Sequence, residues 1–319
     1  MPDMIFTLLT LISSIAILLF SSDRFINGSA ASAKHLGVTP AMIGLTIVAL
    51  GTSAPEIMVS AGAAFDGEAA LGIGNAVGSN IANIALVLGA TALFTAIPLR
   101  EHTLRLEIGL LLLVTIAAIA CLWDLRLTRS EGLLLLLGSI SLPLLLIYQA
   151  RSGTESSSGS SIELSPSAAV LNLLGGLLAL LLSAKLLVWA ATDLATQLGV
   201  SSLMIGLTIV ALGTSLPELA ASLASAIKGH HGIALGNIIG SNILNLLAVM
   251  SLPGIIAPDS AFDSQLLWRD MSIMTGLTLL LAALTLRPSQ AIGRGTGLLL
   301  LGCYIGYYLL LFHSHSTTL

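Results

Sequence analysis

One stretch of this chain occurs twice, and it constrains the fold more than any other feature. The first copy runs from Gly44 to Asn83 and the second from Gly206 to Asn245, at a constant offset of 162 residues. Both begin with GLTIVALGTS and end in GNxxGSNIxN, and 22 of the 40 aligned positions are identical. The match predicts two related halves, so the fold must build the same local structure twice.

The composition indicates that lipid is the main solvent of this chain. Of its 319 residues, 55% are hydrophobic and only 9% are charged, and the mean hydropathy is +0.99. A single water-soluble core cannot hide so much apolar surface. A spanning helix needs roughly 20 apolar residues, and the sequence predicts ten such spans. They lie at about residues 4–34, 40–65, 70–93, 104–122, 131–149, 166–197, 202–227, 232–256, 268–286 and 293–312.

The sequence indicates neither a signal peptide nor a cysteine-based site. The segment from Met4 to Phe20 lacks a basic region and a clear cleavage site, so we interpret it as the first span and not as a signal peptide. Cys121 and Cys303 lie in apolar runs without metal-ligand spacing. We expect neither a disulfide framework nor a bound cofactor.

A polar segment divides the predicted spans into two groups of five. Arg151 to Ser167 is rich in Ser and Gly and is typical of a flexible linker. The predicted divisions are a first five-helix repeat over residues 1–150, the linker over 151–167 and a second repeat over 168–319. Because five is odd, the second half enters the membrane from the opposite side. The expected fold is therefore an all-α membrane protein with ten transmembrane helices in two inverted five-helix repeats.

Basic residues predict the orientation of the chain. If the N-terminus is outside, the inner loops hold Lys34, Arg100, Arg105, Arg151, Lys228, Arg287 and Arg294. The outer loops then hold only Arg126, Arg129 and Arg269. Inner loops carry the excess of Lys and Arg, so we expect both termini on the periplasmic side of a prokaryotic inner membrane.

Glu56 and Glu218 occupy equivalent positions of the two copies, deep in predicted spans. An ionised side chain there costs ~2.5 to 3.5 kcal/mol on insertion scales, and two carboxylates brought together by symmetry would also repel each other. A bound cation would remove both penalties. The structural alternative is an ion pair, for which Lys185 is a candidate partner.

The residues around both glutamates carry oxygen. Thr52 and Ser53 are spaced to share a helical face with Glu56, and Thr214 and Ser215 repeat this spacing before Glu218. Pro55 and Pro217 should kink their helices and free backbone carbonyls. The second segments add two faces with a spacing of four, Asn75, Ser79 and Asn83, and Asn237, Ser241 and Asn245. Such ligands suit Ca²⁺ and Na⁺ better than Zn²⁺ or Cu⁺.

GTSAPE with GNAVGSNIAN, and GTSLPE with GNIIGSNILN, resemble the two alpha-repeats of the cation/Ca²⁺ antiporter superfamily. Within it, the chain is most similar to bacterial and archaeal Na⁺/Ca²⁺ exchangers. The resemblance implies an antiporter that moves Na⁺ and Ca²⁺ by alternating access, with the long first and sixth spans sliding over a site-bearing core. It implies no enzymatic activity and no cofactor, the two ions being substrates. The metal ligands that it implies are Ala49 and Ala211 through their carbonyls, Thr52, Ser53, Glu56, Ser79, Asn83, Thr214, Ser215, Glu218, Ser241 and Asn245.

Asn245 is where the sequence departs from some relatives, which resemble this chain but carry an acid at that position. An amide keeps an oxygen ligand and removes a charge. Because the K⁺-dependent members that resemble this chain carry Asp there, the resemblance argues against K⁺ co-transport, and the missing acid also lowers the case for proton exchange. A Ca²⁺/H⁺ or other cation/H⁺ antiporter stays open as an alternative, and a passive cation channel is a more distant one. The expected partner is the lipid bilayer, without nucleic acid or an obligatory protein partner.

Overall fold

The computed structural model describes residues 2–99, 105–150, 164–199, 209, 211–285 and 291–316. These residues are mostly helical, because a helix satisfies its own backbone hydrogen bonds where lipid offers none. By length and composition, seven helical stretches of the described residues could span a membrane, and eight if a bent pair counts as one span. The seven are Met4–Leu36, Ala69–Phe94, Arg129–Leu146, Pro166–Gln197, His231–Ile256, Leu266–Thr285 and Arg294–His313. A helical membrane protein is thus confirmed.

The remaining predicted spans correspond to shorter helices or fall partly outside the described residues. The bent pair, Pro40–Thr52 with Ala54–Phe65, corresponds to the second span. The fourth is α7, Arg105–Cys121, a helix of 17 residues. Linker residues 151–163 lie outside the described residues, and so does most of the first part of the predicted seventh span. The helix after the linker begins at Pro166, so the last two residues of the predicted linker are helical. The ten-span layout stays a prediction.

The chain forms two compact units, and these are not the two sequence halves. The first unit contains Met1–Pro55 and Ala150–Asn237, and the second contains Glu56–Gln149 and Ile238–Leu319. Each unit therefore takes a part of both halves. Two of the unit boundaries fall inside the repeated stretches, after Pro55 and after Asn237.

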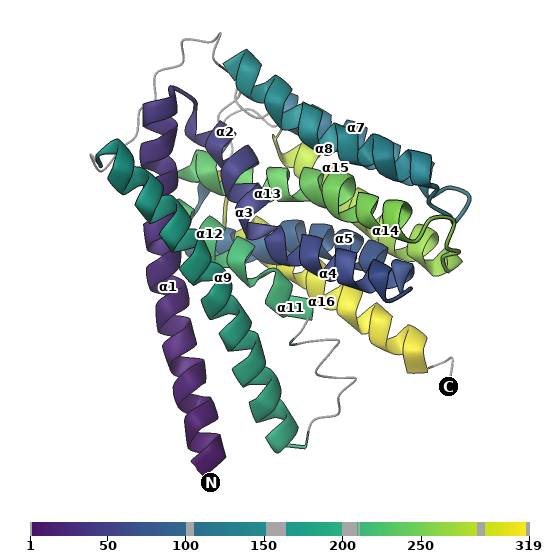
Figure 1. Cartoon of the computed structure of the whole chain (residues 1–319), viewed down its shortest axis with the longest axis horizontal. Helices are drawn as coiled ribbons and strands as arrows, with labels where there is room; N and C mark the ends of the chain where they lie inside the picture. The colour runs from purple at the N-terminus through teal and green to yellow at the C-terminus, as the bar shows by residue number, and fades with distance from the viewer. Residues whose placement is uncertain are drawn as a thin grey trace. The chain divides into compact units, whose positions relative to one another are not determined.

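The first unit is built on two long helices that lie side by side (Figure 1). They are α1, Pro2–Leu36, and α9, Pro166–Gln197. Glycine allows their close contact: a Cβ on Gly28 would lie 2.3 Å from the backbone nitrogen of Leu173. The other helices here are α2 Pro40–Ile43, the π-helix η1 Gly44–Val48, α3 Ala49–Thr52, α11 Ala211–Thr214 and α12 Leu216–Ile227.

The second unit contains the first repeated stretch from Glu56 onward and the second from Ile238 onward. Its helices from the first half are α4 Ala54–Phe65 from Glu56 onward, α5 Ala69–Ala82, η2 Asn83–Leu88, α6 Gly89–Phe94, α7, and α8 Arg129–Ala150 up to Gln149. From the second half come α13 His231–Leu244, whose residues up to Asn237 belong to the first unit, and η4 Asn245–Val249, α14 Met250–Ile256, η5 Leu266–Met271, α15 Ser272–Thr285 and α16 Arg294–Ser316. The strands β1, Ile97–Pro98, and β2, Ala291–Ile292, pair antiparallel.

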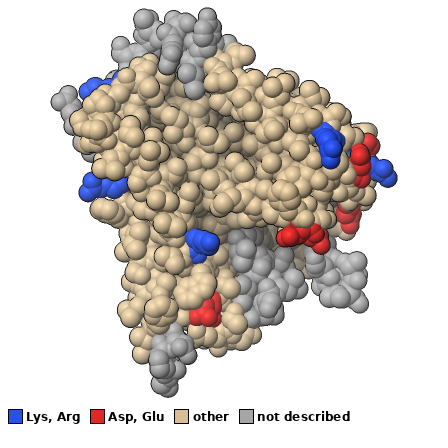
Figure 2. Space-filling view, in the orientation of Figure 1, with Lys and Arg blue, Asp and Glu red and all other residues tan. Residues whose placement is uncertain are grey.

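Apolar side chains cover the outside of the helices and small or polar ones fill much of the inside. Leu9, Phe20 and Leu171 are 62%, 61% and 73% exposed. On the face seen in Figure 2, Lys, Arg, Asp and Glu are sparse and other residues cover most of the surface. A surface of this kind is stable in lipid.

Candidate ion-binding site

The repeated stretch breaks its helix at the same place in both copies. In the first, α3 ends at Thr52 and α4 begins at Ala54, with Ser53 between them at φ −80° and ψ 6°. Proline two residues later has no N–H to donate and its ring crowds the preceding turn. The chain bends by 44° at this break, so the predicted kink is present. In the second copy Ser215 lies between α11 and α12 at φ −86° and ψ 2°.

A second irregularity is also repeated. Asn83 and Asn245 each begin a π-helix, η2 and η4, directly after the α-helix that carries the rest of the motif. A π-turn inserts an extra residue into the helical repeat and is frequent at functional sites. The last asparagine of each motif therefore lies where the regular backbone ladder is interrupted.

In the first unit, hydroxyl and amide groups surround Glu218. We name this group, consisting of Thr52, Ser53, Glu218, Ser222 and Asn237, the Glu218 cluster. Ser53 Oγ donates to Glu218 Oε1 at 3.1 Å, and Thr52 Oγ1 donates to Asn237 Oδ1 at 3.1 Å. Asn237 Nδ2 donates to Ser222 Oγ at 2.9 Å and to the Glu218 carbonyl at 3.5 Å. All five side chains are buried, so the network fixes the orientation of the carboxylate.

In the second unit, the corresponding group is smaller. We name Glu56, Asn75 and Ser79 the Glu56 cluster. Ser79 Oγ donates to Glu56 Oε1 at 3.5 Å, and Asn75 Nδ2 donates to the Glu56 carbonyl at 3.2 Å. Asn75 thus holds the backbone of one glutamate as Asn237 holds the other. The Glu56 side chain is 1% exposed.

Several buried polar atoms near these sequence motifs lack a hydrogen-bond partner within the described part of the chain. In the second unit they include Oγ of Ser241, both amide atoms of Asn83, Asn242 and Asn245, and Oδ1 of Asn80. In the first unit they are Oγ of Ser215 and Oε2 of Glu218. Buried polar groups are nearly always paired. Carboxylate, hydroxyl and amide oxygens left in this state are suitable ligands for a hard cation.

The side chains of both clusters indicate which class of metal ion they could bind. Within the described ranges, no three His, Cys, Asp or Glu side chains group together as a metal site. Soft or borderline metals prefer thiolate and imidazole ligands. Oxygen ligands with one carboxylate in each cluster fit Na⁺ or Ca²⁺ as transported ions.

The structure places the predicted residues in an arrangement that the spacing alone did not show. Thr52 and Ser53 were expected on one helical face with Glu56, but the helix is interrupted at Ser53. The Thr52 hydroxyl instead donates to Asn237 and the Ser53 hydroxyl to Glu218. The hydroxyls of one repeat thus contact the second repeat. The Ala49 carbonyl, a predicted ligand, accepts from Ser53 N at 3.0 Å and from Thr52 Oγ1 at 3.4 Å.

The other predicted ligands of the second copy lie near the ends of their helical segments. Ala211 and Thr214 form the two ends of α11. Ser241 lies on α13 and Asn245 at the start of η4. Lys185, the alternative partner, is exposed, whereas the buried Glu218 carboxylate accepts a hydrogen bond from the Ser53 hydroxyl.

Ser222 was missed by the sequence interpretation. It receives a hydrogen bond from Asn237, and its equivalent Ser60 donates to the Val249 carbonyl at 2.8 Å. Both serines are identical at the offset of 162 residues and lie four residues after their glutamates. That signal could have identified them as parts of the two motifs.

These features define a polytopic helical membrane protein with buried oxygen ligands for hard cations. A family model described as sodium/calcium exchanger protein matches residues 6–148 and 168–313, and the chain belongs to this family. The resemblance drawn from the repeated motifs is thereby confirmed.

Individual relatives match over nearly their whole length. The putative antiporter CaxA of Alkalimonas amylolytica is 46% identical, over 94% of this chain and 97% of the relative. Inner membrane protein YrbG of Escherichia coli (strain K12) is 37% identical, over 95% of each. A solved structure of the sodium-calcium exchanger NCX_Mj has a TM-score of 0.81 at 34% identity, covering 94% of this chain and 97% of that one. The chain is therefore a membrane-embedded cation/Ca²⁺ exchanger, a transporter and not an enzyme, and its ions are substrates without a cofactor.

Proposed function

We propose that this protein is a Na⁺/Ca²⁺ antiporter, in which Na⁺ moving down its gradient drives Ca²⁺ in the opposite direction. The observation that carries the proposal is the pair Asn83 and Asn245. Both are buried at equivalent positions, and both amide atoms of each lack a partner among the described residues. An oxygen-binding cation would use the two carbonyl oxygens and compensate their burial.

The proposed ligands are taken from the repeated motifs of both halves of the sequence. They are Ala49, Thr52, Ser53, Glu56, Ser79, Asn83, Ala211, Thr214, Ser215, Glu218, Ser241 and Asn245, the two alanines through their carbonyls. Glu56 and Glu218 are the only charged side chains among them. Two carboxylates can neutralise one Ca²⁺ or two Na⁺, so the two ions would compete for the same oxygens. Ions that compete for the same oxygens cannot bind together, which favours exchange of Na⁺ for Ca²⁺ and not their co-transport.

The proposed architecture is ten spans in two inverted repeats of five, over residues 1–150 and 168–319. Its support is that one family model matches the chain in two segments, and that the helix break and the π-helix occur in both copies. Alternating access then requires that Na⁺ and Ca²⁺ bind the two states with different affinities. We place the protein in the inner membrane with both termini outside, from its basic loops. The name of the Escherichia coli relative agrees with this membrane.

Charge-neutral variants of the two glutamates test the proposal. Glu56→Gln or Glu218→Gln keeps the shape of the side chain and removes a charged ligand, so Na⁺-gradient-driven Ca²⁺ uptake into vesicles should be abolished. Glu68→Gln is the matched control, because Glu68 is exposed just before α5, and its uptake should equal that of the unaltered protein.

Membrane insertion is measured in parallel from the amount of protein in the membrane fraction. Full uptake by either site variant at normal insertion would contradict the assignment of that glutamate. Equal loss in Glu68→Gln would show that the assay reports general damage to the protein.

A further inference from the structure

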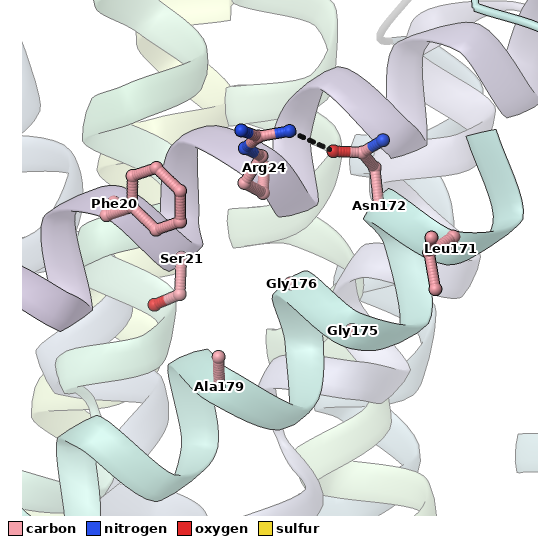
Figure 3. Close-up of a pocket in the computed structure, with 8 residues that line it drawn as sticks. All are labelled: Phe20, Ser21, Arg24, Leu171, Asn172, Gly175, Gly176 and Ala179. Atoms are coloured by element: carbon pink, nitrogen blue, oxygen red, sulfur yellow. Dashed lines mark hydrogen bonds between the residues drawn. The ribbon is translucent and has the colours of Figure 1, made fainter. Parts of the chain in front are cut away.

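A hollow lies between α1 and α9, apart from the residues proposed to bind the transported ions. It has a volume of about 250 Å³ and is lined by Phe20, Ser21 and Arg24 of α1 and by Leu171, Asn172, Gly175, Gly176 and Ala179 of α9. Figure 3 shows that Arg24 and Asn172 point toward one another at one end. All eight residues belong to the first compact unit.

Small residues on α9 create this hollow. A Cβ on Gly176 would lie 2.5 Å from the backbone nitrogen of Phe25, so glycine lets the helices touch there. A Cβ on Gly175 would meet nothing within 4 Å. One glycine thus permits contact, and its neighbour leaves open space beside that contact.

The polar end of the hollow carries a positive charge. Arg24 Nη1 donates to Asn172 Oδ1 at 3.4 Å, and the guanidinium carbon lies 5.0 Å from the centre of the Phe20 ring. Both partners are uncharged. The adjacent acid, Asp23, forms its ion pair with Lys228. Within the described residues, the hydrogen-bonding and ring contacts of Arg24 therefore leave its charge without an anion.

The other walls are apolar and open outward. Phe20 and Leu171 are 61% and 73% exposed, and such surface faces lipid in a membrane-embedded protein. No charged residue lies between Asp3 and Asp23. At 1.5 Å per residue the run from Met4 to Ser22 is about 28 Å long, close to the ~30 Å hydrocarbon thickness. If this run crosses the hydrocarbon layer, Arg24 lies near the level of the lipid head groups.

We propose that this hollow binds an anionic phospholipid, whose phosphate is held by Arg24 and Asn172 and whose acyl chain lies along Phe20, Leu171 and Gly175. A guanidinium binds phosphate through paired, charge-assisted hydrogen bonds. Basic pockets between membrane helices are suited to anionic head groups. A free phosphate ion would use the polar end and leave the apolar walls unfilled, whereas a phospholipid fills both.

Native mass spectrometry of the purified full-length chain tests this site, with phosphatidylglycerol and phosphatidylcholine of identical acyl chains titrated separately. Both lipids carry a phosphate, but the choline of phosphatidylcholine neutralises its charge and would lie beside the Arg24 guanidinium. We therefore expect phosphatidylglycerol to bind about tenfold more tightly, an effect of the size of one hydrogen-bonded charge interaction. Arg24→Gln should abolish this preference. Arg129→Gln is the matched control, because it removes an exposed arginine at the start of α8, and it should keep the preference.

Gly175→Leu tests the apolar part without disturbing the helix contact. Its side chain should fill the open space, and the binding of both lipids should weaken. Retained preference in Arg24→Gln, or unchanged lipid binding in Gly175→Leu, would overturn the proposal. Displacement of phosphatidylglycerol by inorganic phosphate at equal concentration would also overturn it, because the site would then bind phosphate without the lipid. The readout is lipid binding, so the result is independent of which ions the protein exchanges.

Discussion

Asn245 determines how much negative charge the proposed site contains. Its side chain is fully buried, and neither amide atom has a partner in the described ranges. The equivalent Asn83 is in the same state. An acid at position 245 would add a third carboxylate to Glu56 and Glu218, whereas asparagine supplies only a neutral oxygen. The two repeats therefore each supply one carboxylate and one asparagine amide at equivalent positions.

Removal of this amide should weaken ion binding and leave the fold intact. In Asn245→Ala, loss of one oxygen ligand should raise the Ca²⁺ concentration for half-maximal uptake by about tenfold, as expected for an interaction with a charged partner. The measurement is initial uptake rate against Ca²⁺ concentration under a fixed Na⁺ gradient.

Thr115→Val is the control for this experiment. The Thr115 hydroxyl is buried but donates to the Leu111 carbonyl of its own helix, so the half-maximal concentration should not change. An unchanged value in Asn245→Ala would remove Asn245 from the proposed ligands.

At the scale of the elements, the contact between α1 and α9 depends on a few glycines. Gly28 and Gly176 each lie against the backbone of the opposite helix. Membrane helices use such small residues because close backbone approach supplies the packing that the hydrophobic effect cannot supply in lipid. The close packing of α1 and α9 therefore requires glycine at these two contact positions.

Two adjacent substitutions test the glycine contact between α1 and α9. Gly176→Ala should lower the midpoint of thermal unfolding in detergent, because its Cβ would meet the backbone of Phe25 and Arg24. Overpacking of this kind typically costs about 1–3 kcal/mol. Gly175→Ala points into open space and should keep or slightly raise the midpoint, since alanine is the better helix former. Equal midpoints for the two variants would contradict the described helix contact.

At the scale of the whole molecule, the sequence predicted the helical membrane class and the family, because apolar length and the repeated motifs are local signals. Pro55 likewise predicted the break in its helix. The contact of Ser53 with Glu218 was not predictable from spacing, since it depends on how the broken helices pack. The π-helices at Asn83 and Asn245 have no Gly or Pro signal of their own. The compact units also cross the sequence halves, because contacts in space need not follow the order of repeats.

The coupling ion of the proposed exchanger is Na⁺, which it exchanges for Ca²⁺. Radiolabelled Ca²⁺ flux in proteoliposomes, under imposed Na⁺, K⁺ or H⁺ gradients one at a time, tests it most directly. We predict Ca²⁺ uptake when Na⁺ is inside and absent outside, with Na⁺ efflux in parallel, and no uptake above that of empty vesicles under a K⁺ or H⁺ gradient alone. Uptake driven by a pH gradient without Na⁺ would contradict this account and favour a Ca²⁺/H⁺ antiporter. Ca²⁺ entry without any counter-flow of Na⁺ would contradict it in favour of a channel.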